Sequence, residues 1–87
     1  MSINYQTQTD LEGKVKAIFK KVLDIKPEEI VPGAKLDESL GIDSTELVEI
    51  SVGIKKELGV PLADNELKKT QTFNEIVGIL KMKIEKN

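Results

Sequence analysis

Three segments of the chain begin with the same helix-start signal, a residue that can cap a helix followed three positions later by a glutamate. The pairs are Thr9 and Glu12, Asp43 and Glu46, and Thr72 and Glu75. In a capping box the capping side chain and the glutamate each accept a hydrogen bond from the other's backbone N–H. Three such starts within 87 residues predict an all-α chain.

Apolar residues follow each start at helical spacing. The three sets are Leu11, Val15, Ile18, Phe19, Val22 and Leu23; Leu47, Ile50, Ile54 and Leu58; and Phe73, Ile76, Val77, Leu80 and Ile84. Each set forms one apolar face of a helix. We therefore expect helices over about residues 9–23, 44–58 and 73–85, the second ended by Gly59 and Pro61. Gly53 lies inside the second helix, where it serves either close helix packing or local mobility.

The connections complete a small four-helix bundle with three longer helices and one short one, which we place at Ala63–Leu67. Residues 24–43 form a long loop that Pro27 and Pro32-Gly33 keep from becoming a long helix, although "PEEI" can make one short turn. Four apolar residues of this loop are expected to hold it onto the core: Ile25, Ile30, Leu36 and Leu40. We expect residues 1–8 to be a flexible end and residues 9–87 to be a single domain.

Composition excludes several functions. All 13 cations are lysine and the net charge is −2, which argues against nucleic-acid binding because arginine is the usual reader of phosphate and guanine. The chain has no histidine and no cysteine, so we expect no metal site of the common kind and no catalytic serine. No apolar run approaches the length of a membrane span and no signal-peptide core begins the chain. We expect a cytoplasmic monomer that is not an enzyme and does not insert into membranes.

Ser44 is the residue that composition does not explain. Asp43 already provides the cap of the second helix, so Ser44 occupies the first helical position with a free side chain. The unpaired N–H groups and the dipole of a helix N-terminus favour an anion at this position, whereas Asp43 and Glu46 oppose one. Eight acids and only two lysines lie between Asp24 and Glu49. From the residues alone, a plain structural role and attachment of an anionic group both remain open.

The segment "LGIDSTELVEI", residues 40–50, resembles the phosphopantetheine-attachment motif of acyl carrier proteins, whose core is Asp-Ser-Leu after Leu-Gly. The loop "LDIKPEEIVPGAKLDESLGIDS" and the passage "ELGVPLADNEL…TFNEIVGIL" are similar to the same family, so the resemblance covers about residues 9–85. It implies that a phosphopantetheinyl transferase moves 4′-phosphopantetheine from coenzyme A to the Ser44 hydroxyl, beside the motif residue Asp43. The arm carries acyl groups as thioesters to acyl-activating and acyl-transferring enzymes of fatty-acid, lipid or polyketide-type synthesis.

The resemblance also implies roles for the second helix. Its exposed side is the surface that partners recognise, here Thr45, Val48, Glu49, Val52, Lys55 and Lys56. Its core side borders a cavity for the acyl chain, with Leu47, Ile50, Ile54, Phe73 and Ile76 as candidate lining residues. Packing within the core explains these five residues equally well, and Val48 and Val52 could instead edge the core.

Four residues depart from the family's pattern. Thr45 replaces the usual leucine after the serine, Ser39 replaces an acid before Leu-Gly, and Lys55 and Lys56 stand where the family is usually acidic. Carriers of central fatty-acid synthesis typically meet basic surfaces on their enzymes, so the lysine pair predicts a specialised carrier with its own partners. An aminoacyl, peptidyl or D-alanyl carrier is the related alternative, although Gly-Ile-Asp-Ser rather than Gly-Gly-Asp-Ser favours acyl cargo. An unmodified helical interaction domain is the alternative of another class.

Overall fold

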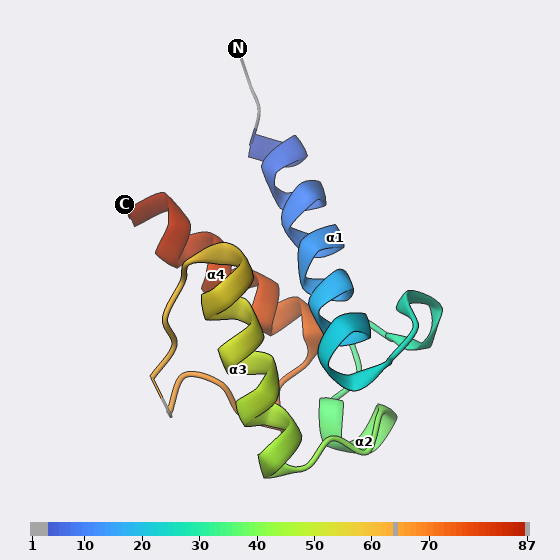
Figure 1. The fold of residues 1–87 in the computed structure, drawn as a ribbon. Coiled ribbons are helices and arrows are strands. Elements are labelled where there is room, and N and C mark those ends of the chain that lie inside the picture. Colours follow the sequence, from blue (N-terminus) through green and yellow to red (C-terminus); the bar gives the residue numbers. More distant parts are fainter. Residues whose placement is uncertain (1–3, 64, 87) are drawn as a thin grey trace.

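The computed structural model describes residues 4–63 and 65–86. Its helices are α1 (Asn4–Leu23), the 3-10 turn η1 (Pro27–Glu29), α2 (Leu36–Ser39), α3 (Ser44–Leu58) and α4 (Phe73–Lys86). The described residues contain no strand, only an isolated bridge between Lys35 and Thr72. The predicted all-α bundle of three longer helices and one short helix is confirmed (Figure 1). No helix in the described part of the chain is long and apolar enough to cross a membrane.

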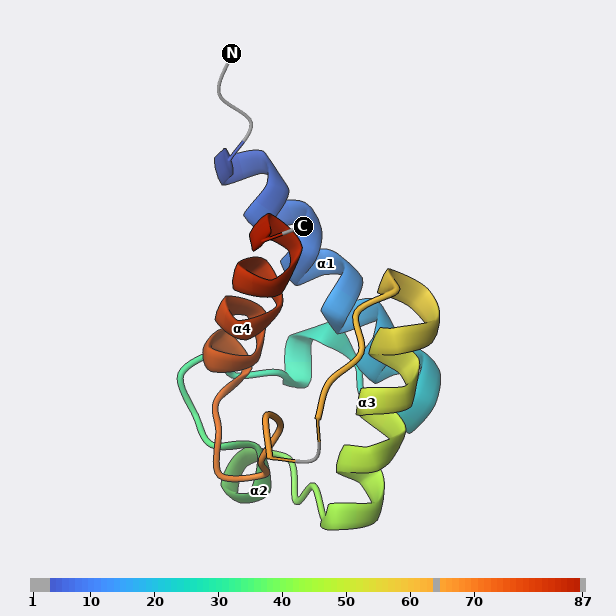
Figure 2. The ribbon, with the colours of Figure 1, turned by 90° about the vertical axis from the view of Figure 1, so that its left-hand side faces the viewer.

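Helix α1 is the element against which α3, α4 and η1 pack. Both α3 and α4 contact it, and residues 59–63 and 65–72 belong to the connection from α3 to α4 (Figures 1 and 2). The start of α1 differs from expectation, because the helix begins at Asn4 and Thr9 therefore lies within it rather than capping it. Residues 1–3 of the predicted flexible end lie outside the described residues, and the flexibility of residues 4–8 stays a prediction.

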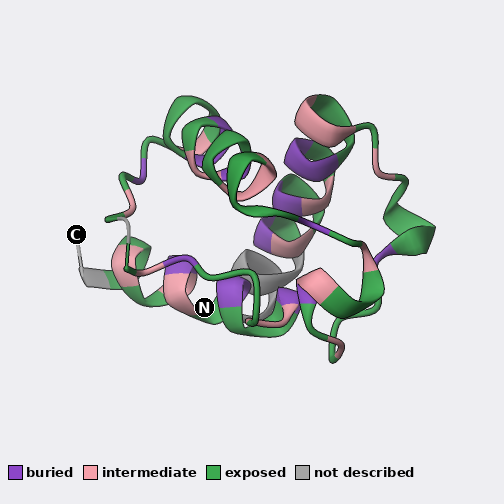
Figure 3. Ribbon diagram, turned by 90° about the horizontal axis from the view of Figure 1, so that it is seen from below, coloured by how far each residue is buried: buried purple, intermediate pink, exposed green. Residues whose placement is uncertain are grey.

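The core is aliphatic, with two phenylalanines at its centre. It contains Leu11, Val15, Ile18, Phe19, Ile30, Leu36, Ile42, Ile50, Ile54, Val60, Leu67, Phe73, Ile76, Val77 and Leu80. The rings of Phe19 in α1 and Phe73 in α4 meet edge to face, with centroids 5.8 Å apart. Ile30 and Leu36 are buried while Ile25 and Leu40 pack against the core, so the prediction that these residues hold the long loop in place is confirmed. Buried positions lie in the loops as well as in the helices (Figure 3).

The short helix is not where we placed it. Residues 65–66 form a turn, and the backbone N–H of Glu66 donates to the Ala63 carbonyl at 3.0 Å. The Glu66 carbonyl accepts a hydrogen bond from the Gln71 side-chain amide at 3.2 Å, which is not a helical hydrogen bond. Within the predicted short helix at Ala63–Leu67, Asp64 lies outside the described residues, and residues 63 and 65–67 are not helical, so the prediction is wrong for these four.

The short helix lies instead inside the long loop, at α2. The first backbone N–H groups of a helix lack partners within the helix. In α2 those of Leu36 and Asp37 donate to the carbonyls of Gln71 and Lys69, each at 2.9 Å. These partners are more than 30 residues away in the sequence, which is why local pattern did not predict the helix. The same bonds fasten the long loop to the segment before α4.

Candidate functional site

The start of α3 presents Ser44 as the sequence predicted. The backbone N–H of Glu46 donates to the Asp43 carboxylate at 2.8 Å, and the Asp43 N–H donates to the Glu46 carboxylate at 3.1 Å. Asp43 is therefore the N-cap and Ser44 the first helical residue. The Ser44 side chain is exposed, and its hydroxyl has no hydrogen bond among the described residues.

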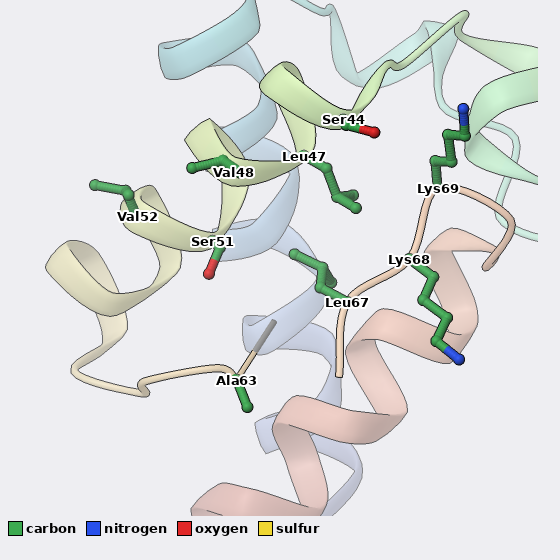
Figure 4. A pocket seen from close by; sticks show the side chains of 9 residues that line it. All are labelled: Ser44, Leu47, Val48, Ser51, Val52, Ala63, Leu67, Lys68 and Lys69. Atoms are coloured by element: carbon green, nitrogen blue, oxygen red, sulfur yellow. The ribbon is translucent and has the colours of Figure 1, made fainter. Parts of the chain in front are cut away.

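An open pocket of about 570 Å³ begins at Ser44. Its walls come from α3 and from the segment between α3 and α4, and its lining residues are Ser44, Leu47, Val48, Ser51, Val52, Ala63, Leu67, Lys68 and Lys69. Figure 4 shows the Ser44 hydroxyl at one end and Leu47 and Leu67 facing each other below it. The pocket therefore offers a mainly apolar surface next to a free hydroxyl.

The structure divides the predicted cavity residues into two groups. Leu47 is half-buried and lines the pocket next to Ser44. The other four, Ile50, Ile54, Phe73 and Ile76, are at most 1% exposed and belong to the packed core. Their role in holding an acyl chain stays a prediction.

All six predicted partner-binding residues lie on the exposed side of α3. Val48 and Val52 are 61% and 58% exposed, and Thr45, Glu49, Lys55 and Lys56 are also exposed. A second groove, of about 400 Å³, lies between α1 and α3 and is bordered by the same two valines. The valines thus form a ridge between two grooves, and the interpretation that they edge the core is wrong.

Two ion pairs tie together the elements that form the two grooves. Lys83 in α4 lies 2.8 Å from Glu66, and Lys21 in α1 lies 2.6 Å from Glu57 in α3. The hydrogen bond from Lys83, assisted by the backbone N–H of Ala63, lowers the pKa of Glu66 below its ordinary 4.5. The hydrogen bond from Lys21 lowers the pKa of Glu57 in the same direction. Both carboxylates are therefore ionised at neutral pH.

Sequence reasoning missed five pocket residues: Ser51, Ala63, Leu67, Lys68 and Lys69. Four of them belong to the segment between α3 and α4, whose path depends on contacts with α2 and α4. Ser51 stands at helical spacing from Ser44 and Leu47, which was the one available signal.

Comparison with known proteins places the chain among carriers. A family model described as "phosphopantetheine attachment site" matches residues 13–80. An acyl carrier protein of Thermosynechococcus vestitus is 34% identical over 77 residues, which are 88% of this chain and 95% of that protein. Acyl carrier proteins of Petrotoga mobilis and Thermotoga maritima are 33% and 31% identical over 78 residues, 90% of this chain and 92% and 96% of those proteins.

Proposed function

The chain belongs to the acyl carrier protein family, and from that premise we propose that Ser44 is the residue that carries its prosthetic group. Family membership implies a covalently attached 4′-phosphopantetheine. The observation that carries the proposal is the free, exposed Ser44 hydroxyl at the mouth of a pocket that can receive an elongated group. Bound there, the group supplies a terminal thiol that holds an acyl group as a thioester.

The neighbours of Ser44 leave its hydroxyl free of a capping role, but they do not activate it as a nucleophile. Asp43 and Glu46 satisfy each other's backbone N–H groups, so Ser44 is not needed as a cap. A serine becomes a nucleophile when a nearby base removes its proton, and the chain contains no histidine. The activating base therefore belongs to a separate phosphopantetheinyl transferase, and the carrier itself catalyses no reaction.

The exposed side of α3 is the surface that this transferase and the acyl-handling enzymes recognise. Two exposed valines at its centre offer apolar area that a partner can bury. Asp43, Glu46 and Glu49 place negative charge toward the Ser44 end, and Lys55 and Lys56 place positive charge in the last turn. We assign acyl rather than aminoacyl cargo, in a specialised pathway of the cytoplasm, to a carrier that acts as a monomer.

Intact mass spectrometry tests the assignment of Ser44. After co-expression with a broad-specificity phosphopantetheinyl transferase, we expect the wild-type chain to gain the mass of one phosphopantetheine. Ser44→Ala should gain nothing, because the hydroxyl that accepts the group is gone. Ser51→Ala is the matched control, since Ser51 lines the same pocket, and it should be modified like the wild type.

Two outcomes would contradict the assignment. A wild-type chain whose mass does not change would favour an unmodified interaction domain, and a Ser44→Ala variant that still gains the group would place it elsewhere. Incubation of the modified chain with acyl-activating and aminoacyl-activating enzymes then separates acyl from aminoacyl cargo. Loading by the aminoacyl enzymes alone would overturn the cargo assignment.

A further inference from the structure

Two lysines, Lys68 and Lys69, line the pocket that begins at Ser44. Figure 4 shows that they point in different directions. The Lys69 side chain extends along the side of the pocket toward which the Ser44 hydroxyl points, whereas Lys68 extends away from Ser44 along α4. Of the two lysines, Lys69 is therefore the cation that faces the proposed attachment site.

The backbone beneath Lys69 is fixed from two directions. The Lys69 carbonyl accepts the N–H of Asp37 in α2 at 2.9 Å, and the Lys68 carbonyl accepts the N–H of Gln71 at 3.0 Å. The Gln71 side chain also holds the Glu66 carbonyl at 3.2 Å. The Lys69 side chain thus starts from an ordered turn, and its ammonium makes no ion pair with the carboxylates in the described ranges.

The surroundings of Ser44 carry negative charge that such a cation can offset. Asp43 precedes Ser44 directly, and Glu46 is held beside it by the capping box. A phosphodiester on Ser44 adds a further negative charge to this acidic helix start. The helix dipole favours that charge and the two carboxylates oppose it.

We propose that Lys69 is a positioning residue for the phosphodiester on Ser44, a role that rests on the function proposed above. Its ammonium offsets the charge of the phosphodiester against Asp43 and Glu46 and draws the group to the side of the pocket formed by the segment between α3 and α4. Lysine suits this task because its charge is compact and its flexible stem adapts to a phosphate oxygen.

The test compares each protein before and after modification. Wild type, Lys69→Gln, Lys69→Arg and Lys68→Gln are modified by the transferase, checked by intact mass and melted in both forms. At low salt, we expect modification to lower the midpoint of thermal unfolding by roughly 1–4 °C more in Lys69→Gln than in the wild type. Lys69→Arg should restore the wild-type behaviour, Lys68→Gln should match it, and about 0.5 M salt should shrink the difference.

The Lys69 side-chain resonances provide a second readout, because modification of the wild type should shift them while leaving those of Lys68 in place. The role of Lys69 would be overturned if modification changed the midpoint of thermal unfolding equally in wild type and Lys69→Gln. It would also be overturned if modification lowered the midpoint of Lys68→Gln as much as that of Lys69→Gln. Those results would leave the function of Ser44 standing, since the mass gain is measured separately. A wild-type chain that gains no mass would remove both.

Discussion

At the scale of single residues, the Ser44 hydroxyl is free because its neighbour Asp43 caps the helix. Serine is itself a favoured helix cap, and a capping serine would have its oxygen engaged by the helix backbone. Here the Asp43 carboxylate accepts the Glu46 N–H, and Ser44 moves one position into the helix with its hydroxyl unbonded. Because Asp43 caps the helix, the Ser44 hydroxyl stays accessible and the start of α3 is not weakened.

Gly53 illustrates a residue whose purpose only the packing reveals. The sequence left close packing and mobility open, and the structure favours close packing. A Cβ built at Gly53 would lie 2.9 Å from Cγ2 of Ile18 and 3.2 Å from Cγ1 of Val22, both in α1. The missing side chain therefore lets α3 approach α1 closely.

The effect of Gly→Ala substitutions should accordingly differ between α3 and α4. We expect Gly53→Ala to lower the free energy of unfolding by about 0.5–2 kcal/mol, because overpacking outweighs the gain in helix propensity. A Cβ at Gly78, in the middle of α4, meets nothing within 4 Å. Gly78→Ala should therefore raise the free energy of unfolding by about 0.5–1 kcal/mol. Urea denaturation measures both, and equal stabilisation of the two variants would show that α1 and α3 are not in close contact at Gly53.

At the scale of elements, α3 combines a start suited to modification with an end of unusual charge. Lys55 and Lys56 in the last turn stabilise the helix through its dipole, and both are exposed beside the Val48–Val52 ridge. The same lysines oppose a partner whose docking surface is basic. We therefore propose that one pair of residues both supports the helix and restricts its partners.

Reversing these charges should change which enzymes use the carrier. We expect Lys55→Glu/Lys56→Glu to raise kcat/KM with fatty-acid synthesis enzymes that bind carriers through basic surfaces, by roughly two- to tenfold at low salt. Lys26→Glu/Lys35→Glu makes the same change of charge at two exposed lysines of the loop between α1 and α3 and should have little effect. Circular dichroism checks that both variants stay folded, and unchanged rates for the α3 variant would contradict the role of the lysine pair.

The helices also show which parts of the fold can be predicted from local sequence. The starts of α3 and α4 were predicted because their capping bonds join residues three positions apart, as in Thr72 and Glu75. The helix α2 was not, because its first N–H groups pair with carbonyls of Lys69 and Gln71. The same limit applies to the site: Ser44 is marked by its own motif, whereas Lys69 reaches the pocket only through the tertiary fold.

At the scale of the whole molecule, the bundle holds the proposed attachment site far from the start of α1 and the end of α4. Helix α1 begins and α4 ends at the opposite end of the molecule from the start of α3 (Figures 1 and 2). The wall of the pocket that does not belong to α3 is fastened at one side by α2 and at the other by the Glu66–Lys83 ion pair. Segments distant in sequence therefore cooperate to keep the pocket open beside Ser44.

This arrangement predicts a dependence of stability on pH. The folded-state pKa of Glu66 lies below its ordinary 4.5, so its contribution to stability is present above that pH and is lost as pH falls through the folded-state pKa. Glu66→Gln should be less stable than the wild type at pH 7, and the difference should vanish at low pH. Thermal melts from pH 7 to about pH 3 measure this, with the exposed Glu28→Gln as control. A gap between wild type and Glu66→Gln that is the same at every pH would rule out the ion pair as its cause.

The most direct measurement is tandem mass spectrometry of the chain purified from the organism that makes it. The fragment that contains Ser44 should carry 4′-phosphopantetheine, and any acyl group on its thiol would identify the natural cargo. A population in which residue 44 is always an unmodified serine, or in which another residue holds the group, would contradict the central claim.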